Sequence, residues 1–258
     1  MTFAELHQQS SPLLLANVWD AASARAAEAA GYAAQGTSSA AIADMLGYAD
    51  GEGLSFVELL EVVTRIRAVS TLPLSVDMEA GYGETAGAVV QNLLALAAQG
   101  VVGINLEDSV VVNGQRSMLE AEVFGQRLQA IRQGLQAAGV NLFINVRTEA
   151  YLLGLPDALE QTLARGQRYG ECGADGLFVP GIIQAEAIRE LAARIAQPLN
   201  VMCMPGLPTF PQLAALGVKR ISMGNFLHGR VQQTLQQLFA TVRSEQSFHC
   251  VFEHAHHG

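Results

Sequence analysis

Short apolar runs alternate with longer amphipathic segments along almost the whole chain, and this alternation limits the folds that the chain can adopt. We expect eight strands, at residues 13–18, 33–37, 74–76, 103–106, 142–146, 176–179, 199–202 and 220–223. The segments between them place apolar residues three and four positions apart, which is the period of a helix packed on one face. Strands that alternate with helices form βαβ units and a parallel sheet.

Eight such units of this size predict an α/β protein, a single-domain (β/α)8 TIM barrel over residues 1–243, followed by a polar C-terminal tail at 244–258. A doubly wound open sheet is the alternative. It usually carries a glycine-rich dinucleotide fingerprint after its first strand, and residues 17–31 contain none. The barrel is therefore favoured.

Composition restricts the class of protein. The 258 residues are 50% hydrophobic and 15% charged, which excludes general disorder. The net charge of −9 disfavours nucleic acid and anionic membranes as partners, and no apolar run approaches the ~20 residues of a membrane helix. The opening segment lacks the features of a secretory leader, and three widely spaced cysteines are typical of a reducing compartment. We expect a cytoplasmic protein.

Lysine and histidine are scarce. Lys219 is the only lysine, and residues 8–227 contain no histidine. Because Lys219 directly precedes the last expected strand, it belongs at the end of the barrel opposite the usual catalytic rim, which argues against a Schiff-base aldolase. The histidines near the C-terminus, from His249 onward, are expected to lie in the tail rather than to form a metal site.

Acidic residues follow three neighbouring strands where a barrel carries its active site. They are Asp77, Glu79, Glu107, Asp108 and Glu149, with Arg147 among them. Like charges this close raise one another's pKa unless a cation neutralises them. Oxygen ligands without nearby histidine or cysteine suit Mg²⁺, with Mn²⁺ as a second choice, and the planar fork of Arg147 suits a substrate carboxylate. The alternative is that these acids cap the helices that follow.

Six segments resemble the isocitrate lyase/phosphoenolpyruvate mutase superfamily, in order and over nearly the whole barrel. The most specific are SVDMEAGYG at 75–83 and INLEDS at 104–109. The others are GTSSAAIADMLGYADGE at 36–52, NVRTEAYL at 145–152, GADGLFVPGI at 173–182 and PLNVMCMPGLPTFPQLAALGVKRISMG at 198–224.

This resemblance implies roles for particular residues. Asp77 is expected to bind Mg²⁺ directly, and Glu79, Glu107 and Asp50 to reach the metal through water. The substrate's 2-oxo-carboxylate end is expected at Thr37, Ser38, Ser39 and Ala40, with Asp77 and Arg147 also in contact. Arg147, Glu107 and Asp50 are the candidate catalytic residues. The resemblance also implies a homotetramer or homodimer, with the last helix possibly swapped between subunits.

The chemistry implied by the resemblance makes or breaks a bond beside a pyruvate unit through a Mg²⁺-stabilised enolate. Lyases of the superfamily carry a K-K-C-G-H loop after strand four, but residues 108–122 hold no Cys, Lys or His, and Asn113 and Arg116 are the polar residues available to reach over a substrate. Pro180 stands where a mutase-type histidine would be.

These features together predict a Mg²⁺-dependent lyase or decarboxylase that acts on a small 2-oxo acid, a related 2-hydroxy acid or a dicarboxylate. One alternative is a phosphonopyruvate-type P–C mutase or hydrolase. In that case the turns at Gly206 and Gly224 would be available to bind phosphate. The other alternative is a homologue that binds 2-oxo acids without catalysis.

Overall fold

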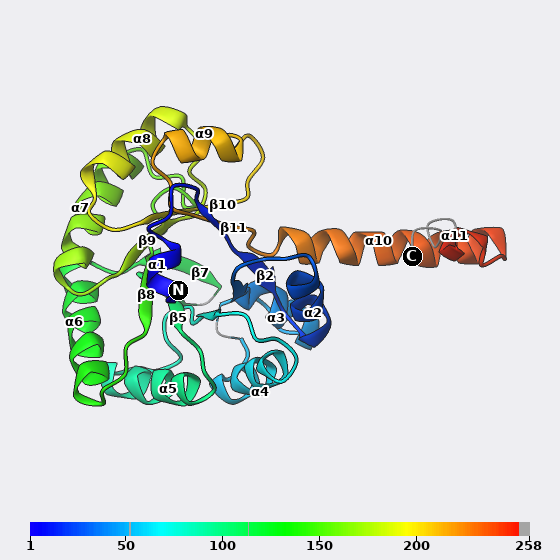
Figure 1. The fold of residues 1–258 in the computed structure, drawn as a ribbon, viewed down its shortest axis with the longest axis horizontal. Coiled ribbons are helices and arrows are strands. Elements are labelled where there is room, and N and C mark those ends of the chain that lie inside the picture. The colour runs from blue at the N-terminus through cyan, green and yellow to red at the C-terminus, as the bar shows by residue number, and fades with distance from the viewer. Residues whose placement is uncertain (52, 113, 253–258) are drawn as a thin grey trace.

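The computed structural model describes residues 1–51, 53–112 and 114–252, and its centre is a parallel sheet curled into a barrel (Figure 1). The first expected strand is split into β1 (Leu13–Leu14) and β2 (Ala16–Val18), which lie at the two ends of the sheet order. β1 pairs with the last strand and β2 with β3, so the short link between them closes the barrel. The expected TIM barrel is therefore confirmed.

The remaining barrel strands follow the expected positions closely. They are β3 (Gln35–Thr37), β4 (Leu74–Asp77), β5 (Gly103–Glu107), β8 (Phe143–Arg147), β9 (Gly176–Val179), β10 (Leu199–Met202) and β11 (Arg220–Ser222). The neighbours in the sheet run in chain order and are parallel. Their C-terminal ends therefore meet at one rim, which is where the acidic residues lie.

Helices surround the barrel and bury one face each against it (Figure 1). They are α2 (Ala21–Ala29), α3 (Ser39–Leu46), α4 (Phe56–Arg67), α5 (Ala86–Ala98), α6 (Ala121–Ala137), α7 (Ala158–Glu171), α8 (Ala185–Arg194) and α9 (Phe210–Ala215). In α4, the buried Leu59, Val63 and Ile66 recur at helical spacing, and Ser55 with Glu58 forms a capping box at its start. The amphipathic pattern of the sequence therefore accounts for the layer of helices outside the barrel.

The N-terminal segment closes the bottom of the barrel. Helix α1 (Phe3–Leu6) brings Phe3 into a buried cluster with Leu13, Leu15, Ala34 and Phe143. His7 stacks on the Phe143 ring at 4.2 Å, and its Nδ1 lies 2.9 Å from the Phe3 carbonyl oxygen. Lys219 Nζ donates to the Gln9 carbonyl at 3.2 Å, so the single lysine lies at this end, as expected.

The segment after β5 forms an antiparallel hairpin of β6 (Ser109–Val112) and β7 (Gln115–Met118). Val111 pairs with Arg116 in its register. The valine run favours strand structure, and Gly114 takes a φ of 75°, which a turn between the strands requires. Asn113 lies outside the described residues. The hairpin places Arg116 over the catalytic rim.

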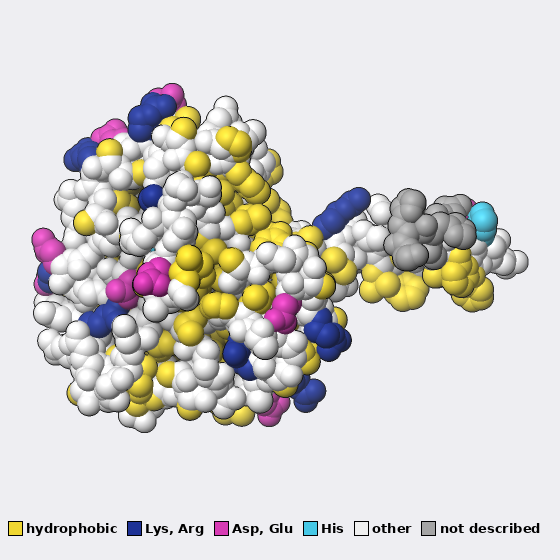
Figure 2. All heavy atoms as spheres, viewed as in Figure 1, with side chains coloured by type: hydrophobic (Ala, Val, Ile, Leu, Met, Phe, Trp, Pro, Cys, Tyr) yellow, Lys and Arg dark blue, Asp and Glu magenta, His cyan; other side chains and the backbone are white. Residues whose placement is uncertain are grey.

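Helix α10 (Phe226–Glu245) projects from the barrel as an arm, and α11 (His249–Phe252) lies near its end (Figure 1). His228 anchors its base, where the ring is buried edge-on to Trp19 with centroids 4.8 Å apart. Hydrophobic side chains gather on one side of the arm (Figure 2). His254, His256 and His257 lie outside the described residues, and within the described ranges no helix combines the length and apolar character needed to cross a membrane.

Candidate active site

A cavity of about 250 Å³ opens at the C-terminal rim of the barrel. Of the residues expected to bind substrate or metal, it is lined by Ser38, Ser39, Ala40, Asp50, Asp77 and Arg147. Glu79 and Glu107 instead line an adjoining pocket of about 330 Å³ beneath the hairpin. Parallel strand order therefore brings together side chains that are more than a hundred residues apart in the sequence.

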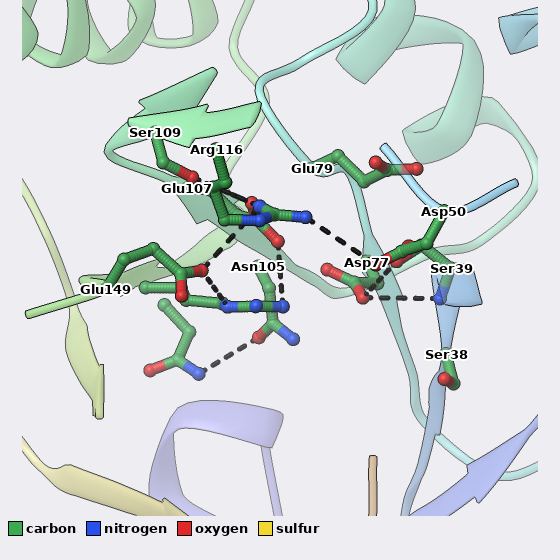
Figure 3. Close-up of polar contacts among 12 residues, drawn as sticks. Ser38, Ser39, Asp50, Asp77, Glu79, Asn105, Glu107, Ser109, Arg116 and Glu149 are labelled. Atoms are coloured by element: carbon green, nitrogen blue, oxygen red, sulfur yellow. Dashed lines mark hydrogen bonds and ion pairs between the residues drawn. The ribbon is translucent and has the colours of Figure 1, made fainter. Parts of the chain in front are cut away.

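Hydrogen bonds hold only one of the two carboxylate oxygens of Asp77. Its Oδ2 accepts hydrogen bonds from the Ser39 backbone N–H at 3.2 Å and from the Ser39 hydroxyl at 2.8 Å (Figure 3). Asp77 is 7% exposed, and its Oδ1 has no hydrogen-bond partner among the described residues. A buried carboxylate oxygen left without a partner is costly unless another group satisfies it. Asp77 is thus positioned to take up a ligand or a cation.

Thr37 lies beneath this contact. Its hydroxyl accepts a hydrogen bond from the Asp77 backbone N–H at 2.8 Å, and its carbonyl accepts one from Asn17 Nδ2 at 3.1 Å. Asn17 Oδ1 in turn accepts from the Met223 backbone N–H at 2.7 Å. Thr37 therefore supports the strand that carries Asp77. Asn17, which lines the cavity, was not anticipated because it is a single polar residue within an apolar strand.

Glu107 and Glu149 are neutralised by Arg147. Arg147 Nη1 lies 2.7 Å from Glu107 Oε1, and Arg147 Nε lies 2.6 Å from Glu149 Oε1. Burial raises the pKa of Glu107 to about 7, with the Asp77 and Glu149 charges adding to the effect and the two arginines opposing it. Burial alone would lower the pKa of Arg147, but the neighbouring carboxylates reverse this and raise it. Arg147 therefore supplies part of the positive charge that this acidic rim requires.

Arg116 extends this ion-pair network from the hairpin. Its guanidinium pairs with Glu107, lies 3.1 Å from Ser109 Oγ and reaches Asp50 at 3.6 Å (Figure 3). Glu149 Oε1 is 3.7 Å away. The side chain lies between Glu107 on one side of the opening and Asp50 on the other (Figure 3). Arg116, one of the two polar residues available in this segment, therefore reaches over the rim.

Asp108 differs from the other four acids of the rim. Its Oδ2 accepts hydrogen bonds from Thr148 Oγ1 at 2.8 Å, Arg165 Nη1 at 3.0 Å and Tyr169 Oη at 2.8 Å. Burial raises the pKa of Asp108 and, together with this carboxylate's charge, that of Tyr169. Asp108 follows β5 directly and bonds to Arg165 and Tyr169 of α7, so it joins the barrel to this helix.

The acids do not serve as helix caps. The helices that follow β4 and β8 begin after Thr85 and Asp157. Glu79 has a φ of 46°, an uncommon backbone conformation for a residue with a side chain, and accepts a hydrogen bond from Tyr82 Oη at 2.7 Å. Within the described residues, no group of three histidine, cysteine or acidic side chains is arranged to bind a metal ion.

Beneath the cavity lies a polar layer that strand periodicity did not reveal. Asn145 Nδ2 donates to Asn105 Oδ1 at 2.9 Å and to Asn200 Oδ1 at 3.0 Å. Arg220, buried in the barrel, donates to Asn105 Oδ1 at 3.3 Å, and burial lowers its pKa to about 9. The only available sequence signal was one polar residue in each of several apolar strands. This layer fixes the amide of Asn105, which lines the cavity.

Comparisons with known proteins agree with this geometry. A family model described as phosphoenolpyruvate phosphomutase matches residues 3–243. An uncharacterised protein of Mycobacterium tuberculosis (strain H37Rv) is 32% identical over 225 residues, covering 87% of this chain and 82% of its own. Oxaloacetate decarboxylase of Pseudomonas fluorescens (strain SBW25) is 28% identical, covering 95% and 84%. A solved structure from Burkholderia cenocepacia J2315, described provisionally as a phosphonomutase, is 39% identical with a TM-score of 0.87, covering 92% and 97%.

Proposed function

The chain belongs to the phosphoenolpyruvate phosphomutase family, within the isocitrate lyase/phosphoenolpyruvate mutase superfamily of enzymes, and from this premise we propose that it is a Mg²⁺-dependent lyase or decarboxylase of a small 2-oxo acid or a related 2-hydroxy acid. One observation carries the proposal: Asp77, at the end of β4, keeps a buried carboxylate oxygen without a partner at the edge of a small cavity. The oxaloacetate decarboxylase relative supports the same class of chemistry.

The donor set fits a hard divalent cation. Asp77 Oδ1 is the direct ligand in this proposal, and Glu79 and Glu107 bind through water, because Mg²⁺ takes few carboxylates directly and keeps several waters. When bound, Mg²⁺ supplies a Lewis acid next to the substrate's 2-oxo group.

The protein's own groups bind and orient the substrate in this proposal. Helix α3 begins at the cavity, and the positive end of its dipole favours an anionic group beside Ala40, whereas the Ser39 N–H is already bonded to Asp77. Ser38 accepts from the Ala41 N–H at 3.4 Å and so keeps this turn in place. Arg147 contacts the substrate from the opposite side, held by Glu107 and Glu149.

Glu107 is our candidate for proton transfer. Burial raises the pKa of its carboxyl group, which favours the protonated form that a general acid needs. In a decarboxylation, the bond to the departing CO2 breaks and the carbon left behind takes up a proton. Glu107 lies beside the cavity to deliver it, either from its carboxyl oxygen or through water. Asp50, half-exposed at the rim and paired with Arg116, helps to hold the hairpin over the site.

Cleavage of a P–C bond is the second candidate, since the 39% identical structure is described provisionally as a phosphonomutase. The two candidates differ in how the second end of the substrate is bound. A phosphonate needs at least one further cation or phosphate-binding turn. Gly224 lines the cavity, and Gly206 is not among its described lining residues.

The test is pyruvate formation from oxaloacetate, substituted malates and phosphonopyruvate, with phosphoenolpyruvate formation from phosphonopyruvate also measured, before and after chelation. We expect turnover of a 2-oxo or 2-hydroxy acid that chelation abolishes and Mg²⁺ restores. Asp77→Ala should lower kcat by at least about 10³-fold, since a Lewis acid contributes several kcal/mol, and should abolish Mn²⁺ binding measured by electron paramagnetic resonance. Glu186→Ala, an exposed acid on α8, is the control. Full turnover after thorough chelation contradicts the proposal, and binding without turnover of any substrate indicates a non-catalytic homologue.

We further propose that the enzyme is a homo-oligomer that exchanges α10. The arm exposes Leu227, Val231, Leu235 and Phe239, more apolar surface than an isolated helix in water would favour. An apolar groove of about 530 Å³ lies at its base, between α9 and β11, lined by residues such as Leu207 and Phe210.

The unpaired Cys172, Cys203 and Cys250 are consistent with a reducing cytoplasm.

A further inference from the structure

The amide of Asn105 lies between the interior of the barrel and the active-site cavity. Its Oδ1 accepts hydrogen bonds from Asn145 Nδ2 at 2.9 Å and from Arg220 Nη2 at 3.3 Å. Its Nδ2 makes no hydrogen bond within the described part of the chain. Asn105 lines the cavity in register with Asp77 of the neighbouring strand, and Figure 3 shows the amide nitrogen on the side of Asp77. The hydrogen-bond donor of this amide therefore faces the cavity.

Arg220 fixes the orientation of this amide. A guanidinium group only donates hydrogen bonds, so the atom of Asn105 that faces it has to be the oxygen. Arg220 is 1% exposed, and its Nε and Nη1 have no partner among the described residues, which leaves Asn105 Oδ1 as the acceptor that it reaches. Turning the amide over would remove that hydrogen bond from a buried cation, which is costly. The charge beside the oxygen also polarises the amide and strengthens Nδ2 as a donor.

Three other neutral donors that line the cavity are already engaged. Asn17 Nδ2 donates to the Thr37 carbonyl at 3.1 Å. The Ser39 hydroxyl donates to Asp77 Oδ2 at 2.8 Å, and the Ser222 hydroxyl donates to a backbone carbonyl at 3.3 Å. Each of these groups would have to break an existing hydrogen bond before it could bind a ligand, whereas the Asn105 amide would not.

An apolar wall lies across the barrel from Asp77 and offers no side-chain donor. Residues such as Phe178 in β9 and Met202 in β10 form it. Arg147 lies beside this wall, with its guanidinium 5.7 Å from the centre of the Phe178 ring, and already pairs with two carboxylates. An anionic group placed against the wall would lose its hydration. The groups best placed to bind an anionic ligand are therefore Arg147, the positive end of α3 and the Asn105 amide.

We propose that Asn105 is a substrate-binding residue whose Nδ2 donates a hydrogen bond to an anionic oxygen of the pyruvate unit, and that Arg220 is a positioning residue that acts through it. The inference rests on the function proposed above and adds a donor for the negative charge that develops as the bond beside the pyruvate unit breaks. A neutral donor suits this place, because a further cation would oppose Mg²⁺ binding at Asp77.

Oxalate is the probe, because it is a planar dianion that resembles the enolate of pyruvate and does not react. Calorimetry with the full-length protein and Mg²⁺ measures its dissociation constant. Asn105→Asp keeps the shape of the side chain and an oxygen for Arg220, but it replaces the donor with an acceptor. We expect oxalate affinity to fall at least about tenfold, while the midpoint of urea unfolding is no lower than in wild type. Asn105→Ala removes the donor without adding charge and should also weaken oxalate binding.

Asn225→Asp is the matched control, because it adds the same charge at the edge of the same cavity. It should lower oxalate affinity less than about threefold, since solvent and salt screen this position. Wild-type affinity in Asn105→Asp or in Asn105→Ala, or an equal loss in Asn225→Asp, overturns the inference and leaves the proposed function standing. If wild type with Mg²⁺ does not bind oxalate, the proposed function fails and this inference with it.

Two variants test the positioning role of Arg220. Arg220→Lys keeps a group that only donates, so the Asn105 amide should hold its orientation and most of the oxalate affinity. Arg220→Gln can donate or accept, so the amide is free to turn and affinity should fall severalfold. Both variants remove the packing of the guanidinium, and a purely structural role predicts the same oxalate affinity for the two. Equal affinities would overturn the role of Arg220.

Discussion

Arg147 is a buried cation with two buried carboxylates, and its ion pairs explain how so many acids share one rim. Glu107 and Glu149 are 2% and 0% exposed, so each depends on Arg147 for compensation of its charge. Asp77 differs, because serine groups bind one of its oxygens and leave the other free of hydrogen bonds within the described chain. The residue expected to bind the metal directly is thus held by serine groups, whereas Glu107 and Glu149 are held by arginine.

Replacing Arg147 with methionine should destabilise the protein by about 3–5 kcal/mol, because removal of one partner leaves buried carboxylates uncompensated. Urea unfolding monitored by circular dichroism at pH 8 measures this loss. Adding Glu149→Gln to Arg147→Met should recover part of the stability, since one of the unpaired charges is removed. Arg189→Met on the surface of α8 is the control. A loss below about 1 kcal/mol would show that solvent reaches these carboxylates.

Among the elements, the N-terminal segment and the β6–β7 hairpin close opposite ends of the barrel. Helix α1 and His7 fill the bottom, where Phe3 and Phe143 meet edge to face with ring centroids 5.6 Å apart. The hairpin lies at the catalytic end and carries Arg116. The bottom closure is apolar and neutral, whereas the top closure is made by ion pairs, so the two ends should respond differently to acid and to salt.

His7 should make the closure at the bottom sensitive to acid. Burial, with the charge of Arg220 adding to it, lowers the pKa of His7 from 6.5 to about 4. Because the folded-state pKa lies below that of the unfolded chain, this stabilisation is complete above pH 6.5 and is lost as pH falls through 4. We expect wild type to lose up to about 3 kcal/mol more than His7→Gln between pH 7 and pH 4. Parallel urea titrations of the two proteins measure it, and coincident pH profiles would show that His7 is already charged in the fold.

At the scale of the whole molecule, α10 exposes more apolar surface than a monomer would favour. The helix leaves the barrel after His228, and hydrophobic side chains on one side of the arm stay largely exposed, with Leu235 at 44% and Phe239 at 67% (Figure 2). Burying such side chains yields roughly 25 cal/mol per Å² of apolar surface, which favours association. In the helix exchange proposed above, the arm of one copy would cover the apolar groove beside β11 of a second copy.

Charge introduced on the arm should therefore dissociate the proposed oligomer. Leu235 and Phe239 are 44% and 67% exposed, and we expect the double substitution Leu235→Glu/Phe239→Glu to convert a dimer or tetramer to monomer in sedimentation velocity. Gln236→Glu adds a charge to the same helix without removing an apolar group and should leave the assembly intact. A monomeric wild-type protein at micromolar concentration would contradict helix exchange.

Much of this protein is determined by local sequence patterns. The alternation of strand and helix periods is enough to predict the barrel, and parallel strands carry Asp77, Glu107 and Arg147 to the same rim wherever their helices pack. Capping boxes such as that of Ser55 and Glu58 depend on neighbours three residues apart and are equally local. The expectation that Lys219 lies at the far end of the barrel follows from the same strand direction.

Tertiary structure decided which partner each of these side chains meets. Asp108 pairs with Arg165 and Tyr169, whereas Glu107 beside it pairs with Arg147 and Arg116, because successive residues at the end of a strand point to opposite sides. The buried Asn145 and Arg220 layer, and the apolar wall opposite Asp77, join residues from different strands. Such contacts depend on distances across the barrel, which no local period encodes, so only the folded chain shows how the charges are compensated and what the cavity can hold.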